Sequence, residues 1–182
     1  MELQTIEGMP FLLTGMLLLT VIGVYGYFRK KPLNKILFFT LLGTYMLFLI
    51  FFVWFPMYIK PGLRFEYVLV QPVPFFTIIK SLSSGSITNI GREICANILM
   101  TVPYGMMIPF LFRSKEKWKY ILNMFGMPLA IEISQLLWCI VLDSHYRMAD
   151  IDDVLLNALG IFIGYVIYRY LPDNIRKFFE FK

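Results

Sequence analysis

Long uncharged stretches alternate with short charged segments along this chain, and the pattern predicts helices that cross a membrane. A helix of about 20 apolar residues is long enough to span the hydrocarbon layer of a bilayer. Five predominantly apolar stretches approach or exceed this length, at residues 10–28, 36–58, 94–112, 120–142 and 151–171. We therefore expect an all-α integral membrane protein, with a single domain over residues 1–182 built as a bundle of five transmembrane helices.

The connection between the second and third predicted helices has two parts. Residues 67–79 are largely apolar but too short to span, and Pro72 and Pro74 interrupt them. Proline lacks a backbone donor and blocks a regular helix, so we expect this part to be either interfacial or re-entrant. Residues 80–93 are rich in serine and prone to turns, and we expect them to form a surface loop.

Composition and charge agree with a membrane location and suggest an orientation. Charged residues make up 16% of the chain, against about 25% in soluble domains. Basic residues gather at 29–35, at 113–119 and in the C-terminal tail. Because Lys and Arg are enriched in cytoplasmic loops, we expect the C-terminus in the cytoplasm and the N-terminus outside, together with residues 60–93 and the loop before the last helix. The first nine residues carry no basic side chain, unlike a cleavable signal peptide, so the first helix is expected to be retained.

Several classes of function lack their signatures. No polybasic stripe with interleaved aromatic residues is present, so no nucleic-acid partner is expected. Cys95 and Cys139 lie in apolar runs, and zinc-ligand spacings, GxSxG, HExxH and a glycine-rich phosphate loop are missing. We expect no cofactor. A Ser-His-Asp arrangement would have to use His145, the only histidine.

Polar residues within the predicted helices, and in the loop between the last two, form the candidate ligand site. Ionisable groups at membrane depth are costly and normally face a bundle interior or a watery cavity. The candidates are Asn97, Tyr104, Glu132, Gln135, Arg147, Asp150, Asp152, Asp153 and Asn157. At about 1.5 Å per helical residue, Glu132 lies roughly 15 Å below the outer end of its helix, while Asn97 and Asn157 lie within about 6 Å of theirs. We expect a polar pocket that opens outward.

Two roles are open for Glu132. The first is structural, as an acid that holds helices together. The second is functional, either as a catalytic acid/base or as a charge that recognises a ligand. Gly160 and Gly164 are spaced for close packing of helix backbones in lipid.

The acidic loop also leaves alternatives open. Asp150 and Asp153 suit an N-cap and third-position pair at the start of the last helix. A divalent cation bound by Asp150, Asp152 and Asp153 is a second interpretation. In a third, Arg147 binds a phosphate or carboxylate.

These residues also carry a resemblance to a known family. The sequence resembles the VanZ-like family of bacterial membrane proteins in NILMTVPYGMMIP from Asn97, in IEISQ at 131–135 and in RMADIDDVLLNALGIFIGY at 147–165, and PVPF at 72–75 is similar to its short proline-phenylalanine loop. Thr101 departs from the family pattern, in which an aromatic residue is common. The resemblance implies a multi-pass protein of the bacterial cell membrane that lowers susceptibility to lipoglycopeptides such as teicoplanin.

Two main hypotheses of function follow. In the first, the outward pocket engages an amphiphile: a lipid-linked wall precursor, an anionic lipid or the acyl-sugar part of a lipoglycopeptide. In the second, the protein is an intramembrane enzyme that modifies a lipid-linked envelope substrate, with Glu132 as acid/base. A structural partner of the wall-synthesis machinery is a third possibility. In all three the lipid bilayer is a partner.

Overall fold

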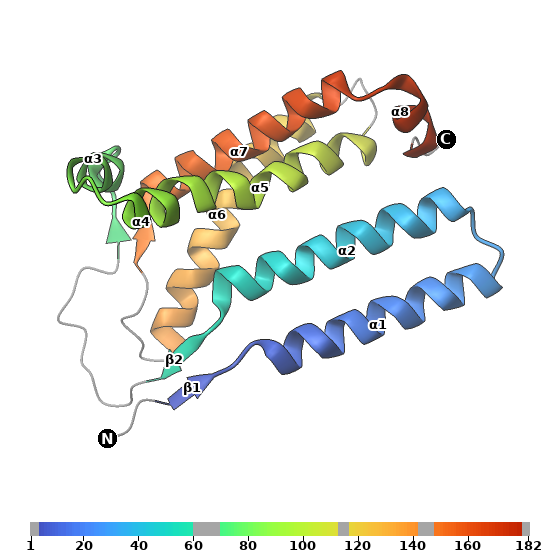
Figure 1. The fold of residues 1–182 in the computed structure, drawn as a ribbon, viewed down its shortest axis with the longest axis horizontal. Helices are drawn as coiled ribbons and strands as arrows, with labels where there is room; N and C mark the ends of the chain where they lie inside the picture. Colours follow the sequence, from blue (N-terminus) through green and yellow to red (C-terminus); the bar gives the residue numbers. More distant parts are fainter. Residues whose placement is uncertain (1–3, 60–69, 113–116, 142–147, 180–182) are drawn as a thin grey trace.

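The computed structural model describes residues 4–59, 70–112, 117–141 and 148–179, and confirms the predicted all-α membrane protein. Five helices are long and apolar enough to cross a membrane (Figure 1). They are α1 (Met9–Phe28), α2 (Leu33–Trp54), the continuous helix Ile87–Phe110, α6 (Lys117–Val141, apolar from Trp118) and α7 (Ile151–Tyr170). A short helix, α8 (Asp173–Phe179), follows α7.

The third transmembrane helix begins earlier than predicted. It comprises α4 (Ile87–Ile90), a π-helical turn η1 (Gly91–Cys95), α5 (Ala96–Met107) and a 3-10 turn η2 (Ile108–Phe110). Together with α3 (Phe76–Ser83), it leaves only residues 84–86 outside helices, so the predicted surface loop over 80–93 is wrong. Two of the serines that suggested a loop bond to the backbone at helix ends: the Ser84 hydroxyl donates to the carbonyl oxygen of Ser81 at 2.7 Å, and the Ser86 hydroxyl accepts from the Asn89 amide at 3.4 Å.

Two short strand pairs, which the sequence did not indicate, lie at the end of the bundle that holds the N-terminus (Figure 1). β1 (Gln4–Ile6) pairs antiparallel with β2 (Met57–Ile59). β3 (Val70–Gln71) pairs parallel with β4 (Ala149–Asp150), and Gln71 lies opposite Asp150. The second pair ties the connection between the second and third transmembrane helices to the start of α7.

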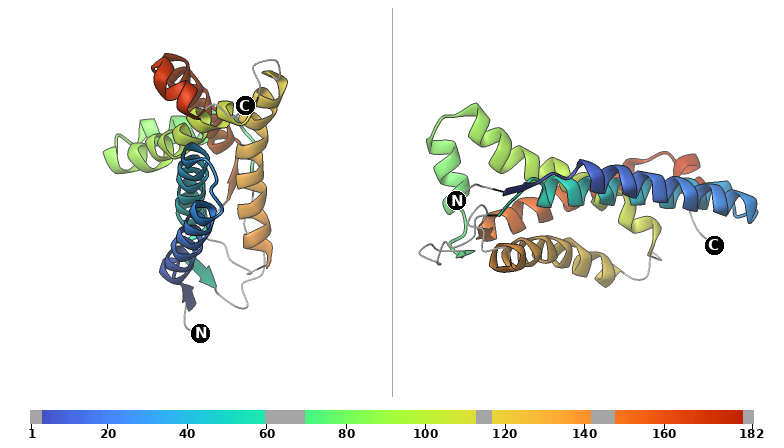
Figure 2. Two further views of the ribbon diagram at one scale, coloured as in Figure 1. Left: turned by 90° about the vertical axis from the view of Figure 1, so that its right-hand side faces the viewer. Right: turned by 90° about the horizontal axis from the view of Figure 1, so that it is seen from below.

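The helix α3 lies across the same end of the bundle, at a steep angle to the transmembrane helices (Figures 1 and 2). Its apolar residues Phe76, Ile79 and Leu82 are exposed, whereas Ser81 is buried. This polarity is the reverse of a soluble surface helix and is that of a helix whose outer face contacts lipid. The described part of the predicted segment, residues 70–79, thus ends in a helix that lies across the end of the bundle (Figure 1).

The helix α7 is the centre of the bundle, and α5 runs beside it in the same direction. A Cβ atom on Gly105 would overlap the carbonyl oxygen of Ile161, and one on Gly160 would overlap that of Ile98. Gly164 approaches the backbone of α5 just as closely. The two backbones are therefore in direct contact, as small residues allow in lipid-embedded helices. By contrast, α1 has no buried side chain and packs mainly on α2.

Thr101 is part of this contact. It is fully buried, and its hydroxyl donates to the carbonyl oxygen of Asn157 at 2.8 Å. A Cβ on Gly160 would overlap the same hydroxyl. The departure from the resembled family pattern thus has a physical reason in this chain, because a small polar side chain fits between the two helices.

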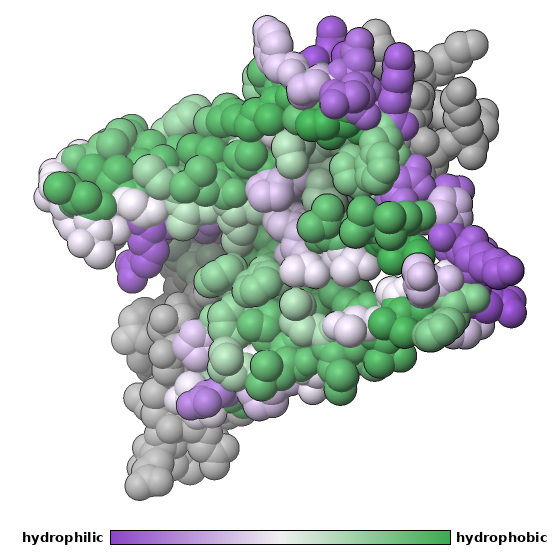
Figure 3. Space-filling model, turned by 45° about the vertical axis from the view of Figure 1, so that its right-hand side comes forward, coloured by the Kyte–Doolittle hydropathy of each residue, from purple (hydrophilic) through white to green (hydrophobic). Residues whose placement is uncertain are grey.

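The surface is divided by polarity. On the face seen in Figure 3, apolar side chains cover the flanks of the helices and hydrophilic ones gather mainly at their ends. The α1–α2 turn with Arg29, Lys30 and Lys31 lies at the same end as α8, and the strands, α3 and α4 lie at the other (Figure 1). The basic end and the strand end are therefore opposite.

Substituting Gly105 with alanine should destabilise the protein, because the new methyl group meets a backbone atom that has no rotamer by which to move away. Overpacking of this kind costs about 1–3 kcal/mol. We expect G105A to lower the thermal unfolding midpoint of the detergent-solubilised protein. The matched control is G126A on α6, where nothing lies within 4 Å of the new Cβ. Equal midpoints for the two variants would contradict the direct backbone contact.

Candidate functional site

Glu132 on α6 forms a hydrogen bond with Asp150, the residue directly before α7. Its Oε2 accepts a hydrogen bond of 3.0 Å from the backbone amide of Asp150, and both side chains are buried. This contact places Glu132 level with the start of α7. Asn157, seven residues further along α7, then lies about 10 Å deeper than Glu132. The predicted order of depths is therefore wrong, because α6 and α7 do not end and begin in one plane.

Asp150 is the N-cap of α7, as predicted. Its Oδ1 accepts from the amide of Asp152 at 2.9 Å, and its Oδ2 accepts from the hydroxyl of Thr77 on α3. In a reciprocal cap the Asp153 side chain would accept from the Asp150 amide. Here that amide donates to Glu132 instead. A residue of another helix thus completes the cap.

Asp152 is fully buried and caps α3 from a distance of more than 70 residues in sequence. Its Oδ2 accepts from the amides of Thr77 at 2.9 Å and Ile78 at 3.1 Å, and its Oδ1 accepts from the amide of Phe75. Phe75 has a left-handed backbone, with φ of 65°, and offers no capping side chain itself. The carboxylate satisfies donors that α3 leaves unpaired, and the positive end of that helix favours its charge.

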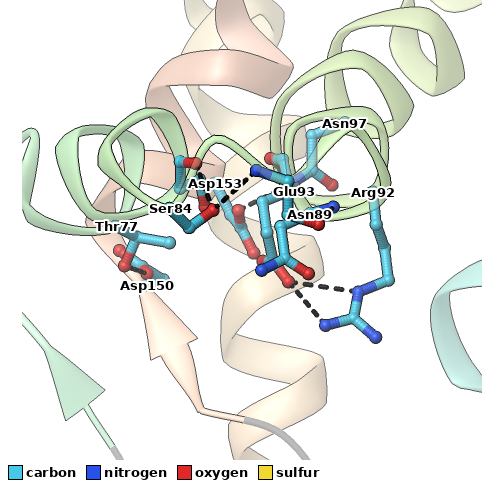
Figure 4. Close-up of polar contacts among 10 residues, drawn as sticks. Thr77, Ser84, Asn89, Arg92, Glu93, Asn97, Asp150 and Asp153 are labelled. Carbon is cyan, nitrogen blue, oxygen red and sulfur yellow. Dashed lines mark hydrogen bonds and ion pairs between the residues drawn. The ribbon is translucent and has the colours of Figure 1, made fainter.

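Asp153 faces α5 instead. The side-chain amide of Asn97 donates to Asp153 Oδ1 and, at 3.1 Å, to the carbonyl oxygen of Glu93 within η1 (Figure 4). Bonds in a π turn run to the fifth residue rather than the fourth, and such turns are frequent at functional sites. We call Glu132, Asp150, Asp152 and Asp153 the acidic node.

Asn157 lies beneath the acidic node with an unpaired oxygen. The side chain is 1% exposed, and its Oδ1 has no hydrogen-bond partner in the part of the chain that the structure describes. Leaving a buried acceptor unpaired costs about 1–3 kcal/mol. Such a group is a natural point for a bound molecule to donate a hydrogen bond.

Two of the predicted site residues bond elsewhere. The Tyr104 hydroxyl donates to Asn123 Oδ1 at 2.7 Å, and Gln135 Nε2 donates to the carbonyl oxygen of Val53 near the end of α2 at 3.2 Å. Both bonds join helices, and neither partner is a member of the acidic node. Arg147, like His145, lies outside the described residues.

The acidic node is rich in acceptors. Within the described ranges, no group of three His, Cys, Asp or Glu residues could hold a metal ion. Asp150 and Asp152 both accept from Thr77 on α3, and Asp153 accepts from Asn97 on α5. All four members of the node are carboxylic acids, and the Arg92 guanidinium, seen in the same view, bonds to Glu93 (Figure 4). The chemistry of the node suits a ligand that presents hydroxyl or amine donors, whereas an anionic group would need a cation such as Arg147.

Sequence reasoning missed the donors of this site. Thr77 and the amides at the start of α3 are as important to it as the acids, and Thr101 links the two helices beneath it. The one available signal was the PVPF segment directly before them, since a proline-rich turn often precedes a helix.

Asp152→Asn should release α3. The asparagine keeps the shape, but it loses the charge and turns an NH₂ group toward donors. Hydrogen bonds to a charged group are worth about 1.5–3 kcal/mol each. We expect faster hydrogen exchange of amides in residues 75–83, measured by mass spectrometry. The control is D173N, which changes an exposed aspartate that pairs with Arg176 on α8. Unchanged exchange in D152N would contradict the capping role.

Comparison with known proteins supports the resemblance seen in the sequence. No curated protein and no solved structure matches this chain. The model of one protein family, VanZ/LLP1, matches residues 42–172. The match includes the acidic node, α3 and both glycine-packed helices, and excludes α1 and the first part of α2. This chain belongs to the VanZ/LLP1 family.

Proposed function

We propose that this protein resides in the bacterial cell membrane, where it engages an amphiphile of the outer leaflet through the acidic node and so lowers susceptibility to lipoglycopeptides such as teicoplanin. The observation that carries the proposal is the junction of two features. Buried acceptors lie directly behind α3, and the opposite face of α3 offers Phe76, Ile79 and Leu82 to lipid.

The charge distribution supports the outward location of the node. The α1–α2 turn with Arg29, Lys30 and Lys31, the start of α6 and α8 lie at the end opposite the node (Figure 1). Under the positive-inside rule the basic end is cytoplasmic, so the node lies toward the outer leaflet. Lipid-linked wall precursors and the acyl-sugar parts of lipoglycopeptides are amphiphiles of that leaflet.

The donors and acceptors support the class of ligand. Sugars and amino sugars present hydroxyl and amine donors, which the acids and the unpaired Asn157 Oδ1 would accept. An acyl chain would lie against the apolar face of α3. We assign Glu132 a positioning role, because its Oε2 already holds the amide of Asp150.

The orientation can be tested by cysteine labelling in intact cells. In a background with Cys95 and Cys139 replaced by serine, we expect S83C on α3 to react with a membrane-impermeant maleimide. K177C on α8 should react only after permeabilisation, because Lys177 belongs to the basic end. Both positions are exposed. The reverse pattern would place the acidic node toward the cytoplasm and reject the proposal.

Asn157→Leu separates binding from stability. Replacing an unpaired buried polar group with an apolar one of similar shape is close to neutral or stabilising. We therefore expect N157L to keep its thermal unfolding midpoint but to lose the teicoplanin tolerance that the wild-type protein confers. Tolerance is measured as the minimum inhibitory concentration, and the response to vancomycin should not change. A variant that retains full tolerance would show that this oxygen does not serve a ligand.

A charge-neutral double substitution extends the test to the node. E132Q with R147Q should also lower teicoplanin tolerance, since the glutamine still accepts from Asp150 but carries no charge. E7Q with K177Q is the matched control, because both side chains are exposed and neither belongs to the node. Abundance in the membrane is measured for each variant. If cells with the wild-type protein contain an envelope lipid that is absent from cells with E132Q, the protein is instead an enzyme.

A further inference from the structure

A pocket of about 440 Å³ lies at the turn between α1 and α2. It is lined by Tyr27, Phe28, Lys30, Lys31, Leu33 and Ile36. The volume falls in the range of about 300–1,000 Å³ that is usual for sites of small molecules. This turn is at the basic end of the bundle, opposite the acidic node (Figure 1), so the pocket is separate from the site proposed above.

The polar side of the pocket is strongly basic. Lys30 and Lys31 are exposed, and neither has an acidic partner among the residues that the structure describes. The sequence contains no acid at all between Glu7 and Glu66. Two ammonium groups therefore belong to the pocket lining without an acidic partner within the described ranges, and they favour an anionic ligand.

The start of α2 adds to this field. The N-cap residue, Pro32, provides no side-chain hydrogen bond, and the first turn contains no acidic residue. The α2 helix is 22 residues long, and the N-terminus of such a helix carries a partial positive charge that attracts anions. Leu33, its first residue, lines the pocket, so the helix end and both lysines border the same space.

The backbone holds Lys30 at this place. Its φ is 52°, a left-handed conformation in which glycine is the usual residue at a helix end. The amide of Lys31 donates to the carbonyl oxygen of Gly26 at 3.1 Å, which closes α1 in the manner of a Schellman motif. A lysine at this position keeps a cation at the turn where a glycine would leave none.

The other side of the pocket is apolar and faces the bilayer. Tyr27 and Phe28 are 70% and 76% exposed, and Leu33 is 60% exposed. They stand at the adjoining ends of two apolar transmembrane helices, at the level where aromatic side chains mark the membrane interface. The lysines on one side of the pocket match the charged headgroup of a lipid, and the apolar side chains on the other side match its acyl chains.

We propose that this pocket binds an anionic glycerophospholipid of the leaflet at the basic end. The phosphate lies between Lys30, Lys31 and the start of α2, and the acyl chains run along Phe28, Leu33 and Ile36. The site anchors the α1–α2 hairpin, whose first helix contributes no buried side chain to the bundle. It does not depend on the function proposed for the acidic node.

Native mass spectrometry of the full-length protein in detergent tests this inference. Titration with palmitoyl-oleoyl phosphatidylglycerol should show one lipid bound more tightly than phosphatidylcholine of the same chains. Each basic residue near an anionic surface contributes enough for K30Q with K31Q to lower the affinity for phosphatidylglycerol about 10–30-fold. The affinity for phosphatidylcholine should not change.

The control variant carries K119Q with K177Q, which removes the same charge from the same end of the molecule outside the pocket. It should keep the wild-type preference. Equal loss in both double variants would reduce the effect to net charge and overturn the site, as would a wild-type protein without preference. Displacement of the lipid by millimolar inorganic phosphate would assign the pocket to a free anion and also overturn it.

Discussion

A buried carboxylate that accepts from backbone amides determines how the end of this bundle is assembled. The first amides of a helix have no partner within the helix and must be satisfied by other groups. Asp152 satisfies them for α3 and Asp150 for α7, while Glu132 accepts the remaining amide of Asp150. The acids thus form a chain in which each one fixes the start of the next segment.

A further contact of the acidic node, that of Asp153 with Asn97, depends on the close packing of α5 and α7. Because Gly105 and Gly160 let the two backbones touch, Asn97 on α5 comes within reach of Asp153 on α7. Wider spacing would leave both polar groups unpaired in an apolar medium, at a considerable cost. The position of the candidate site is therefore set by two residues that have no side chain.

The sequence allowed prediction of what local patterns encode. The five transmembrane helices follow from uncharged runs, and the cap at Asp150 follows from its place before an apolar helix. The helix α3 could not be predicted, because its first amides are satisfied by Asp152, more than 70 residues away. The depth of Glu132 was also out of reach, since counting residues assumes that neighbouring helices share one boundary plane, whereas β4 places the start of α7 beside the middle of α6.

The π turn at Gly91–Cys95 has a consequence for how this family can vary. A wide turn accommodates one residue more than a regular one, and each residue corresponds to about 100° of rotation around a helix axis. The rotation of α4 about its axis is therefore set independently of the rotation of α5, which is fixed by the glycine contacts with α7. Gain or loss of a single residue in this turn would rotate α4, and α3 with it, while α5 and α7 kept their alignment.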